Sequence, residues 1–199
     1  MMTSRTLWIR SISALILVVS SLNVAAYDCN EKSPTFKKEG DNYFNFHDAK
    51  PLTTEQRTDI KRIFSSLKKR LRGEGVVTLC EDIEGKTIKV VSKEKLSAEV
   101  ELQSNGHLSI QLDVYNRHNK ISDIESLNYF SKTDHLSFIS KAPNSFSFSY
   151  KIRNFNRRGV NVFKEKFVTL SVNDGVLTIH TLNFYFGYFV SSTKRTLHP

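Results

Sequence analysis

The chain has 199 residues, of which 39% are hydrophobic and 25% are charged, and its 29 basic and 20 acidic residues give a formal net charge of +9. This length fits one domain with at most a short additional arm, so it excludes a multidomain organisation. Such a chain buries roughly two-thirds of its unfolded surface, which is enough for a core without many disulfides. The basic surplus favours partners that carry negative charge.

The first 26 residues have the layout of a secretory signal peptide. Arg5 and Arg10 precede a short apolar run at residues 12–19, and small residues lead up to Ala26. The run is shorter than the roughly 20 apolar residues that cross a bilayer. We therefore expect cleavage after Ala26, with an uncleaved anchor as the alternative. Removal of residues 1–26 takes away two basic residues and no acidic one, which leaves 173 residues with a formal charge of +7.

Two cysteines, Cys29 and Cys80, remain after this cleavage. In a protein bound for an oxidising compartment, such a pair predicts one disulfide. A catalytic or metal-binding thiol would need a second cysteine or a histidine at ligand spacing, and the sequence offers neither. The sequence therefore predicts a disulfide-bonded protein that is periplasmic or secreted.

Residues 27–52 are polar and rich in turn formers, and they predict an extended N-terminal arm. A single amphipathic helix follows this arm. Thr53 and Gln56 form a capping-box pattern, and apolar residues then recur at helical spacing. We expect the helix to end at Gly73 or Gly75, with basic residues in its last turns.

From Val76 onward the apolar period changes from helical to alternating, which is typical of β-strands. The Asn-Gly pair at residues 105–106 and the Asn-Asp-Gly run at residues 173–175 indicate tight hairpins. Residues 191–199 resemble a polar C-terminal tail. The pattern predicts about eight mostly antiparallel strands, and residues 53–190 form the single helix-plus-sheet domain.

The predicted fold class is α+β, with one N-terminal amphipathic helix packed on a curved, mostly antiparallel sheet. The helix needs a partner for its apolar stripe, and the sheet supplies the large apolar face. A small closed β-barrel is the alternative arrangement for such a meander.

No catalytic motif is found in the sequence, which lacks a nucleophile elbow, a phosphate loop and a zinc-protease helix pair. The six histidines show no metal-ligand spacing, although His180 stands out because it lies in the middle of a strand. Acidic clusters at residues 81–84 and 123–125 are typical of solvated turns. We therefore expect a protein that is not an enzyme and that has no cofactor and no metal.

Two clusters of basic residues are candidate contacts for an anionic partner. Outside the cytoplasm the available polyanions are lipid head groups, lipopolysaccharide, acidic glycans and extracellular or incoming DNA, and of these a nucleic-acid partner is the least expected. A solvated surface that keeps the protein soluble is the alternative interpretation. The candidate anion contacts are Arg62, Lys68, Lys69, Arg70, Arg72, Lys151, Arg153, Arg157 and Arg158.

Residues 182–190, LNFYFGYFV, carry aromatic side chains on both sides of a predicted strand. A central strand buried on both faces, or a bulge at Gly187, accounts for this pattern. Alternatively, one face lines a lipid-sized cavity or meets a partner, because exposed aromatic patches mark interaction surfaces. The candidate cavity or interface residues are Phe146, Phe148, Tyr150, Phe184, Tyr185, Phe186, Tyr188 and Phe189.

Two functions fit these features. The first is a non-enzymatic periplasmic or secreted binding protein for an anionic amphiphile or glycan, such as a lipid or lipopolysaccharide. The second is an accessory protein of a cell-envelope or secretion assembly, which docks on another protein. Peripheral contact with a membrane is compatible with both.

Overall fold

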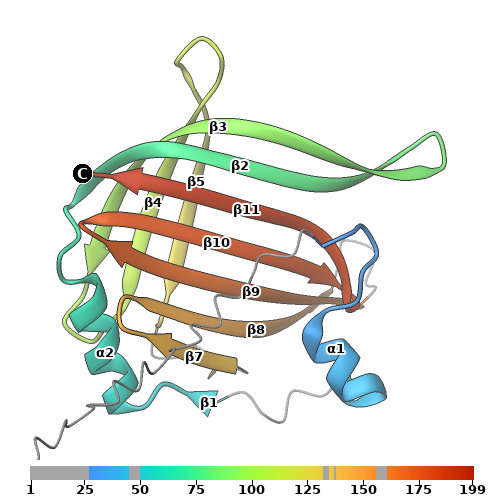
Figure 1. The fold of residues 1–199 in the computed structure, drawn as a ribbon, viewed down its shortest axis with the longest axis horizontal. Helices are drawn as coiled ribbons and strands as arrows, with labels where there is room; N and C mark the ends of the chain where they lie inside the picture. Colours follow the sequence, from blue (N-terminus) through green and yellow to red (C-terminus); the bar gives the residue numbers. More distant parts are fainter. Residues whose placement is uncertain (1–26, 45–49, 132–134, 137, 156–160) are drawn as a thin grey trace, which may run out of the picture.

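A nine-stranded antiparallel sheet forms the body of the molecule (Figure 1). The computed structural model describes residues 27–44, 50–131, 135–136, 138–155 and 161–199. The predicted signal peptide lies outside the described residues, and so do the candidate anion contacts Arg157 and Arg158. A separate two-stranded ribbon pairs β1 (Lys50–Pro51) with β6 (His135–Leu136).

The strand order of the sheet is β5-β4-β3-β2-β11-β10-β9-β8-β7, and every neighbouring pair is antiparallel. In the described part of the chain its edges, β5 and β7, do not pair with each other, so the sheet is a curled half-barrel and the closed-barrel alternative is wrong. The predicted curved antiparallel sheet is confirmed. The strands are β2 (Arg70–Ile83), β3 (Lys86–Leu102), β4 (Leu108–Tyr115), β5 (Ile121–Tyr129), β7 (Phe138–Ala142), β8 (Ser145–Phe155), β9 (Asn161–Asn173), β10 (Val176–Tyr185) and β11 (Tyr188–His198).

Helix α2 (Thr54–Phe64) begins as the sequence predicts. The Gln56 amide donates to the Thr53 hydroxyl, and the Thr53 amide donates to the Gln56 side chain. These two bonds form a capping box, which satisfies amide groups that the first helical turn leaves without partners.

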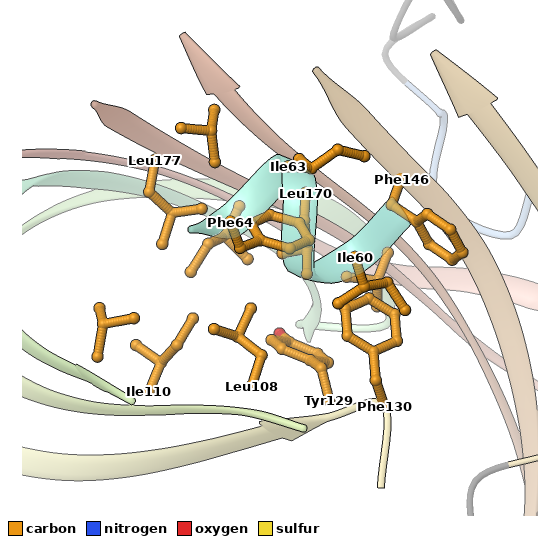
Figure 2. Close-up of a cluster of buried hydrophobic side chains, with 14 of the residues drawn as sticks. Ile60, Ile63, Phe64, Leu108, Ile110, Tyr129, Phe130, Phe146, Leu170 and Leu177 are labelled. Carbon is orange, nitrogen blue, oxygen red and sulfur yellow. The ribbon is translucent and has the colours of Figure 1, made fainter. Parts of the chain in front are cut away.

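The helix packs against one face of the sheet, which is called the inner face here (Figure 2). Its buried residues Ile60, Ile63 and Phe64 meet aliphatic and aromatic side chains from both halves of the sheet, including Leu108 and Leu170. Burying a side chain of this size contributes roughly 1.5–3 kcal/mol. The predicted packing of helix on sheet is therefore confirmed.

The helix ends earlier than predicted. It stops at Phe64, and the basic segment from Arg70 is strand β2, so the sheet begins before Val76. Gly73 pairs with both neighbouring strands, and a Cβ there would overlap the carbonyl oxygen of Thr196 in β11, so the close approach of β11 requires glycine. Each glycine would cost a helix about 1 kcal/mol relative to alanine, whereas strand pairing on both sides supplies the backbone with partners.

The predicted C-terminal tail is also wrong. Residues 191–199 contribute most of β11, which lies between β2 and β10 near the centre of the sheet. Polar side chains make this strand hard to recognise from the sequence. On its inner face, however, the buried charge has partners. There the nearly buried Arg195 forms ion pairs with Glu94 at 2.7 Å and with Glu125 at 2.6 Å.

The expected extended arm contains helical turns. In residues 27–44, called the N-terminal segment here, helix α1 (Pro34–Glu39) is followed by a 3-10 turn (Gly40–Phe44). Ser33 caps α1 by accepting a hydrogen bond from the Phe36 amide, and such caps favour a helix over extended chain. The predicted disulfide between Cys29 and Cys80 is confirmed, and it ties this segment to β2.

The aromatic stretch at residues 182–190 is a hairpin rather than one strand. β10 ends at Tyr185, Phe186 and Gly187 form a two-residue turn with positive φ angles, and β11 begins at Tyr188. Because the chain reverses here, the apparent two-sided strand consists of two strands. A register shift at Asn183/Phe184 changes the alternation further.

Candidate functional site

A shallow depression lies on the outer face of the sheet, opposite α2, where β3, β2 and β11 run side by side. Its volume is about 740 Å³. The side chains that line it alternate with buried inner-face residues such as Leu71 and Leu197, and they are mostly basic. This basic depression is lined by Arg72, Glu74, Val76, Lys93, Lys95, Lys194, Thr196 and His198, together with Gly73, Gly75 and Leu96.

The strand register arranges these side chains in rows across the sheet. Val76 pairs with Lys93 on one side and with Lys194 on the other. Since adjacent strands lie about 4.8 Å apart, the two lysine backbones are roughly 10 Å apart with an exposed valine between them. In the next row Glu74 lies between Lys95 and Thr196.

The positive charge of this depression is largely uncompensated. Among the described residues, Arg72, Lys93, Lys95 and Lys194 take part in no ion pair, and Glu74 is the single carboxylate that lines the depression. All four cations are exposed. Four basic groups beside one acidic group form a surface that attracts anions.

His180 borders this surface, because it pairs with Lys194 across β10 and β11. Burial lowers the pKa of its imidazole, and the charge of Lys194 lowers it further. The neighbouring histidine therefore favours its neutral form, and the positive charge comes from the lysines and Arg72.

Local glycines allow the strands to approach here without side-chain conflict. A Cβ at Gly75 would overlap the carboxylate of Glu94, which reaches Arg195 on the inner face. Because Glu94 and Glu125 pair with Arg195, that arginine adds no free cation to the outer surface.

A second depression of about 640 Å³ adjoins the first through Arg72. It includes the carboxylates of Glu99 and Asp113 as well as Arg70, and Arg70 forms an ion pair with Glu99 at 3.2 Å. Its mixed charge makes it a weaker candidate for an anion.

Of the predicted anion contacts that the structure describes, only Arg72 lines the basic depression. Lys68 and Lys69 are exposed in the connection between α2 and β2. Side chains that already have protein partners are Arg62 with Asp59, Arg70 with Glu99, Lys151 with Glu39, and Arg153 with the Phe44 carbonyl. Sequence analysis missed Lys93 and Lys95 on β3 and Lys194 on β11. The available signal was that these lysines alternate with inward-facing residues along their strands, but the two strands are distant in the sequence.

The predicted aromatic residues do not line a common cavity. Phe146, Phe148 and Tyr150 pack in or against the inner core. Phe184 and Phe189 are buried in a different cluster, where their ring centroids lie 5.8 Å apart. The three that remain exposed are Tyr185, Phe186 and Tyr188.

This different cluster, the outer cluster, lies beneath the N-terminal segment. Tyr27 contacts both Phe184 and Phe189, and Tyr43 contacts Phe163. The fully buried Glu165 accepts a 2.9 Å hydrogen bond from the Tyr43 hydroxyl. Burial raises the pKa of the Glu165 carboxyl, although hydrogen bonds from neighbouring side chains oppose this effect.

Among the described residues, no group of three or more His, Cys, Asp or Glu side chains is arranged to hold a metal ion. No helix in the described part of the chain combines the length and apolar character needed to cross a bilayer. No model of a known protein family matches the chain, and a search of curated proteins finds no match.

Proposed function

We propose that this chain is a non-enzymatic extracytoplasmic binding protein for an anionic amphiphile or glycan, and that the basic depression receives the anionic group. The observation that carries this proposal is that four cations line one depression, Arg72, Lys93, Lys95 and Lys194, and form no ion pair with any described residue. Lysine and arginine form charge-assisted hydrogen bonds with phosphate, sulfate and carboxylate groups. An anion would supply the charge partners that the described residues lack.

Exposed apolar side chains beside the cations favour an amphiphile. Val76 is 40% exposed, and Val91, one row further along β3, is 63% exposed. A ligand with an apolar part could cover these valines while its anionic group meets Lys93 or Lys194. Contact of this kind removes apolar surface from water, which contributes about 25 cal/mol per Å².

The disulfide supports a compartment outside the cytoplasm. Disulfides such as Cys29–Cys80 persist in oxidising environments and are rare in the cytosol. We propose that the mature protein is periplasmic or secreted, as the signal-like N-terminus predicts. Lipid head groups and acidic glycans are the anions available there.

The test is a charge reversal at the paired lysines, Lys93→Glu with Lys194→Glu. The probes are a water-soluble short-chain phosphatidylglycerol and a sulfated oligosaccharide, with phosphatidylcholine of the same chain length as the neutral reference. We expect calorimetric titration to show at least a tenfold loss of affinity for the anionic probe that binds, which corresponds to about 1.4 kcal/mol. Binding should also weaken as salt is added.

The matched control is Lys68→Glu with Lys69→Glu, which changes the net charge equally at exposed residues outside the depression. This control should retain most of the affinity. Equal losses in both double variants would show that net charge, rather than the depression, attracts the ligand. Absence of binding to either anionic probe by the unchanged protein would reject the proposal.

A different surface favours the second candidate function, docking on an envelope protein. The far ends of β2 and β3 form a ribbon that projects beyond the rest of the sheet (Figure 1). On this ribbon Ile83 and Ile88 are 45 and 43% exposed, and Leu79, at its base where β2 still pairs with β11, is 39% exposed. If Ile83→Ser with Ile88→Ser abolishes crosslinking to an envelope protein while ligand binding is absent, docking becomes the preferred function.

A further inference from the structure

Three hairpin turns in this sheet have the same backbone geometry. Each consists of two residues with positive φ angles: Glu84 and Gly85 (51° and 76°), Asp174 and Gly175 (51° and 77°), and Phe186 and Gly187 (48° and 84°). This geometry matches the type I′ turn, whose first position prefers Asn, Asp or Gly. Two of the three turns have an acidic residue there, whereas the third has a phenylalanine.

Phenylalanine is poorly suited to this position. A bulky residue with positive φ is a rare and strained case, because its Cβ crowds the backbone. Burial of the ring could offset the strain, but Phe186 is 44% exposed. Among the described residues, its ring makes no aromatic or cation–π contact. Nearly half of the side chain therefore remains in contact with water, and no aromatic partner favours a phenylalanine at this point.

Two further exposed rings flank Phe186. Tyr185 and Tyr188 are 38% and 39% exposed, and they pair directly across the hairpin. Together with Phe186 they form a feature called the aromatic turn here. The turn closes the end of β10 and β11 beside α1, far from α2 and the C-terminus (Figure 1).

Two lysines, Lys32 and Lys164, lie beside the aromatic turn. The Lys164 ammonium lies 4.8 Å from the centre of the Tyr185 ring. Lys32 forms a β-bridge with Tyr188, and its ammonium lies 5.1 Å from the centre of the Phe36 ring. Aromatic rings with lysines beside them match a surface on which negatively charged groups cover an apolar layer. The rings would contact the apolar layer, and the lysines would contact the charged groups.

We propose that the aromatic turn inserts into the interfacial region of an anionic lipid bilayer. Tyrosine and other aromatic side chains concentrate at the boundary between head groups and acyl chains, and nearby lysines bind anionic lipids. The three residues together expose on the order of 250 Å². A stable protein interface needs about 800 Å² per partner, so the exposed rings fit a lipid surface better than a protein partner.

This inference does not depend on the basic depression, which lies toward the other end of the sheet and includes His198. The two surfaces can therefore be disabled separately. Lys93→Glu with Lys194→Glu should remove binding of a soluble anionic probe, and the aromatic turn should not affect that binding.

The test replaces Phe186 with asparagine in the disulfide-bonded protein purified after export of the full chain. Binding is measured by co-sedimentation with phosphatidylcholine vesicles that contain or lack phosphatidylglycerol. We expect the unchanged protein to bind the anionic vesicles, and Phe186→Asn to weaken this binding about tenfold. The same substitution should raise the temperature of thermal unfolding, because asparagine suits a type I′ turn. Tyr185→Ser with Tyr188→Ser should also weaken vesicle binding.

Ile124→Asn is the matched control, because this side chain is 59% exposed on β5 and lies away from the turn. It should bind vesicles like the unchanged protein. Unaltered vesicle binding by Phe186→Asn would overturn the proposal, and so would a fall in its unfolding temperature, which would assign Phe186 a structural role. Failure of the unchanged protein to bind vesicles, with crosslinking of the turn to a protein instead, would also overturn it.

Discussion

The sheet carries an apolar cluster on each face, and the two clusters are held together differently. The inner core covers many strands and packs around three residues of α2, Ile60, Ile63 and Phe64. The outer cluster is aromatic, encloses the carboxyl of Glu165, and is covered by the N-terminal segment. The inner core is a cluster of apolar side chains bordered by the ion pairs of Arg195, whereas the outer cluster contains a buried carboxyl and is covered by a segment that a disulfide ties to the sheet.

The largest effect should come from breaking the inner core. Phe64 is 1% exposed, and its ring lies 6.2 Å from that of Phe130. Phe64→Ala should lower the free energy of unfolding by about 3–5 kcal/mol, because it leaves a cavity in close-packed surroundings. Denaturant titration measures this change. Ile124→Ala, at a residue 59% exposed, is the control and should change stability by less than about 0.5 kcal/mol.

Removal of the disulfide should affect the outer cluster more than the inner core. Cys29 and Cys80 are separated by 51 residues. Replacing both with serine should cost about 2–4 kcal/mol, chiefly because the unfolded chain gains freedom. Hydrogen exchange should show faster exchange in the N-terminal segment, while α2 remains more protected. Equal loss of protection in both regions would contradict the separation of the two clusters.

A smaller effect is expected at the start of α2. Thr53→Ala removes the side-chain half of the capping box and should lower stability by about 1 kcal/mol. Chemical denaturation measures the change. Thr54→Ala, one residue further on, makes no contribution to the cap and serves as the control. Because alanine has the higher helix propensity, Thr54→Ala should not lower stability, and a similar loss in both variants would contradict the role of the cap.

The smallest effect should be a pH dependence of the outer cluster. Burial raises the pKa of the Glu165 carboxyl, while hydrogen bonds from Thr35, Ser33 and Tyr43 and the charge of Lys151 oppose the shift. A raised carboxyl pKa means that the folded state holds the proton more tightly than the unfolded state. The stabilisation is therefore present at pH values below the ordinary carboxyl pKa and is lost as the pH rises through the raised value.

Hydrogen exchange of the N-terminal segment at a series of pH values measures this effect. Exchange, corrected for its intrinsic pH dependence, should accelerate as the pH rises above the ordinary carboxyl range. Glu165→Gln should remove this component, because glutamine does not titrate. Asp59→Asn is the control. Asp59 lies in α2, and the hydrogen bond and charge of Lys141 lower its pKa. This substitution should leave the pH dependence of exchange in the N-terminal segment unchanged. If Glu165→Gln retained the pH dependence of exchange in the N-terminal segment, the role of this carboxyl would be refuted.

Sequence patterns predicted the features that depend on neighbouring residues. The Thr53 capping box, the helical spacing of Ile60 and Ile63, and the hairpin at residues 173–175 all form as expected. The disulfide also followed, because two cysteines allow one pairing. Each of these rests on local geometry or on simple counting.

The errors occurred where distant strands decide the outcome. The periodic pattern that begins in α2 continues to Leu71, but pairing of β2 with β3 and β11 converts that part into a strand. Residues 191–199 lack clear apolar alternation, yet the central place of β11 and the ion pairs of Arg195 keep them in the sheet.

The sequence by itself determined the helix start, the alternating strands, the cysteine pair and the positive charge of this protein, because these follow from local periodicity and composition. Only the tertiary structure decided which charges gather at one place. Arg72, Lys93 and Lys194 line the same depression because antiparallel pairing sets their register across three strands. The aromatic rings of residues 146–150 and 182–190 separate into different environments for the same reason, since strand order and register determine which face each side chain occupies.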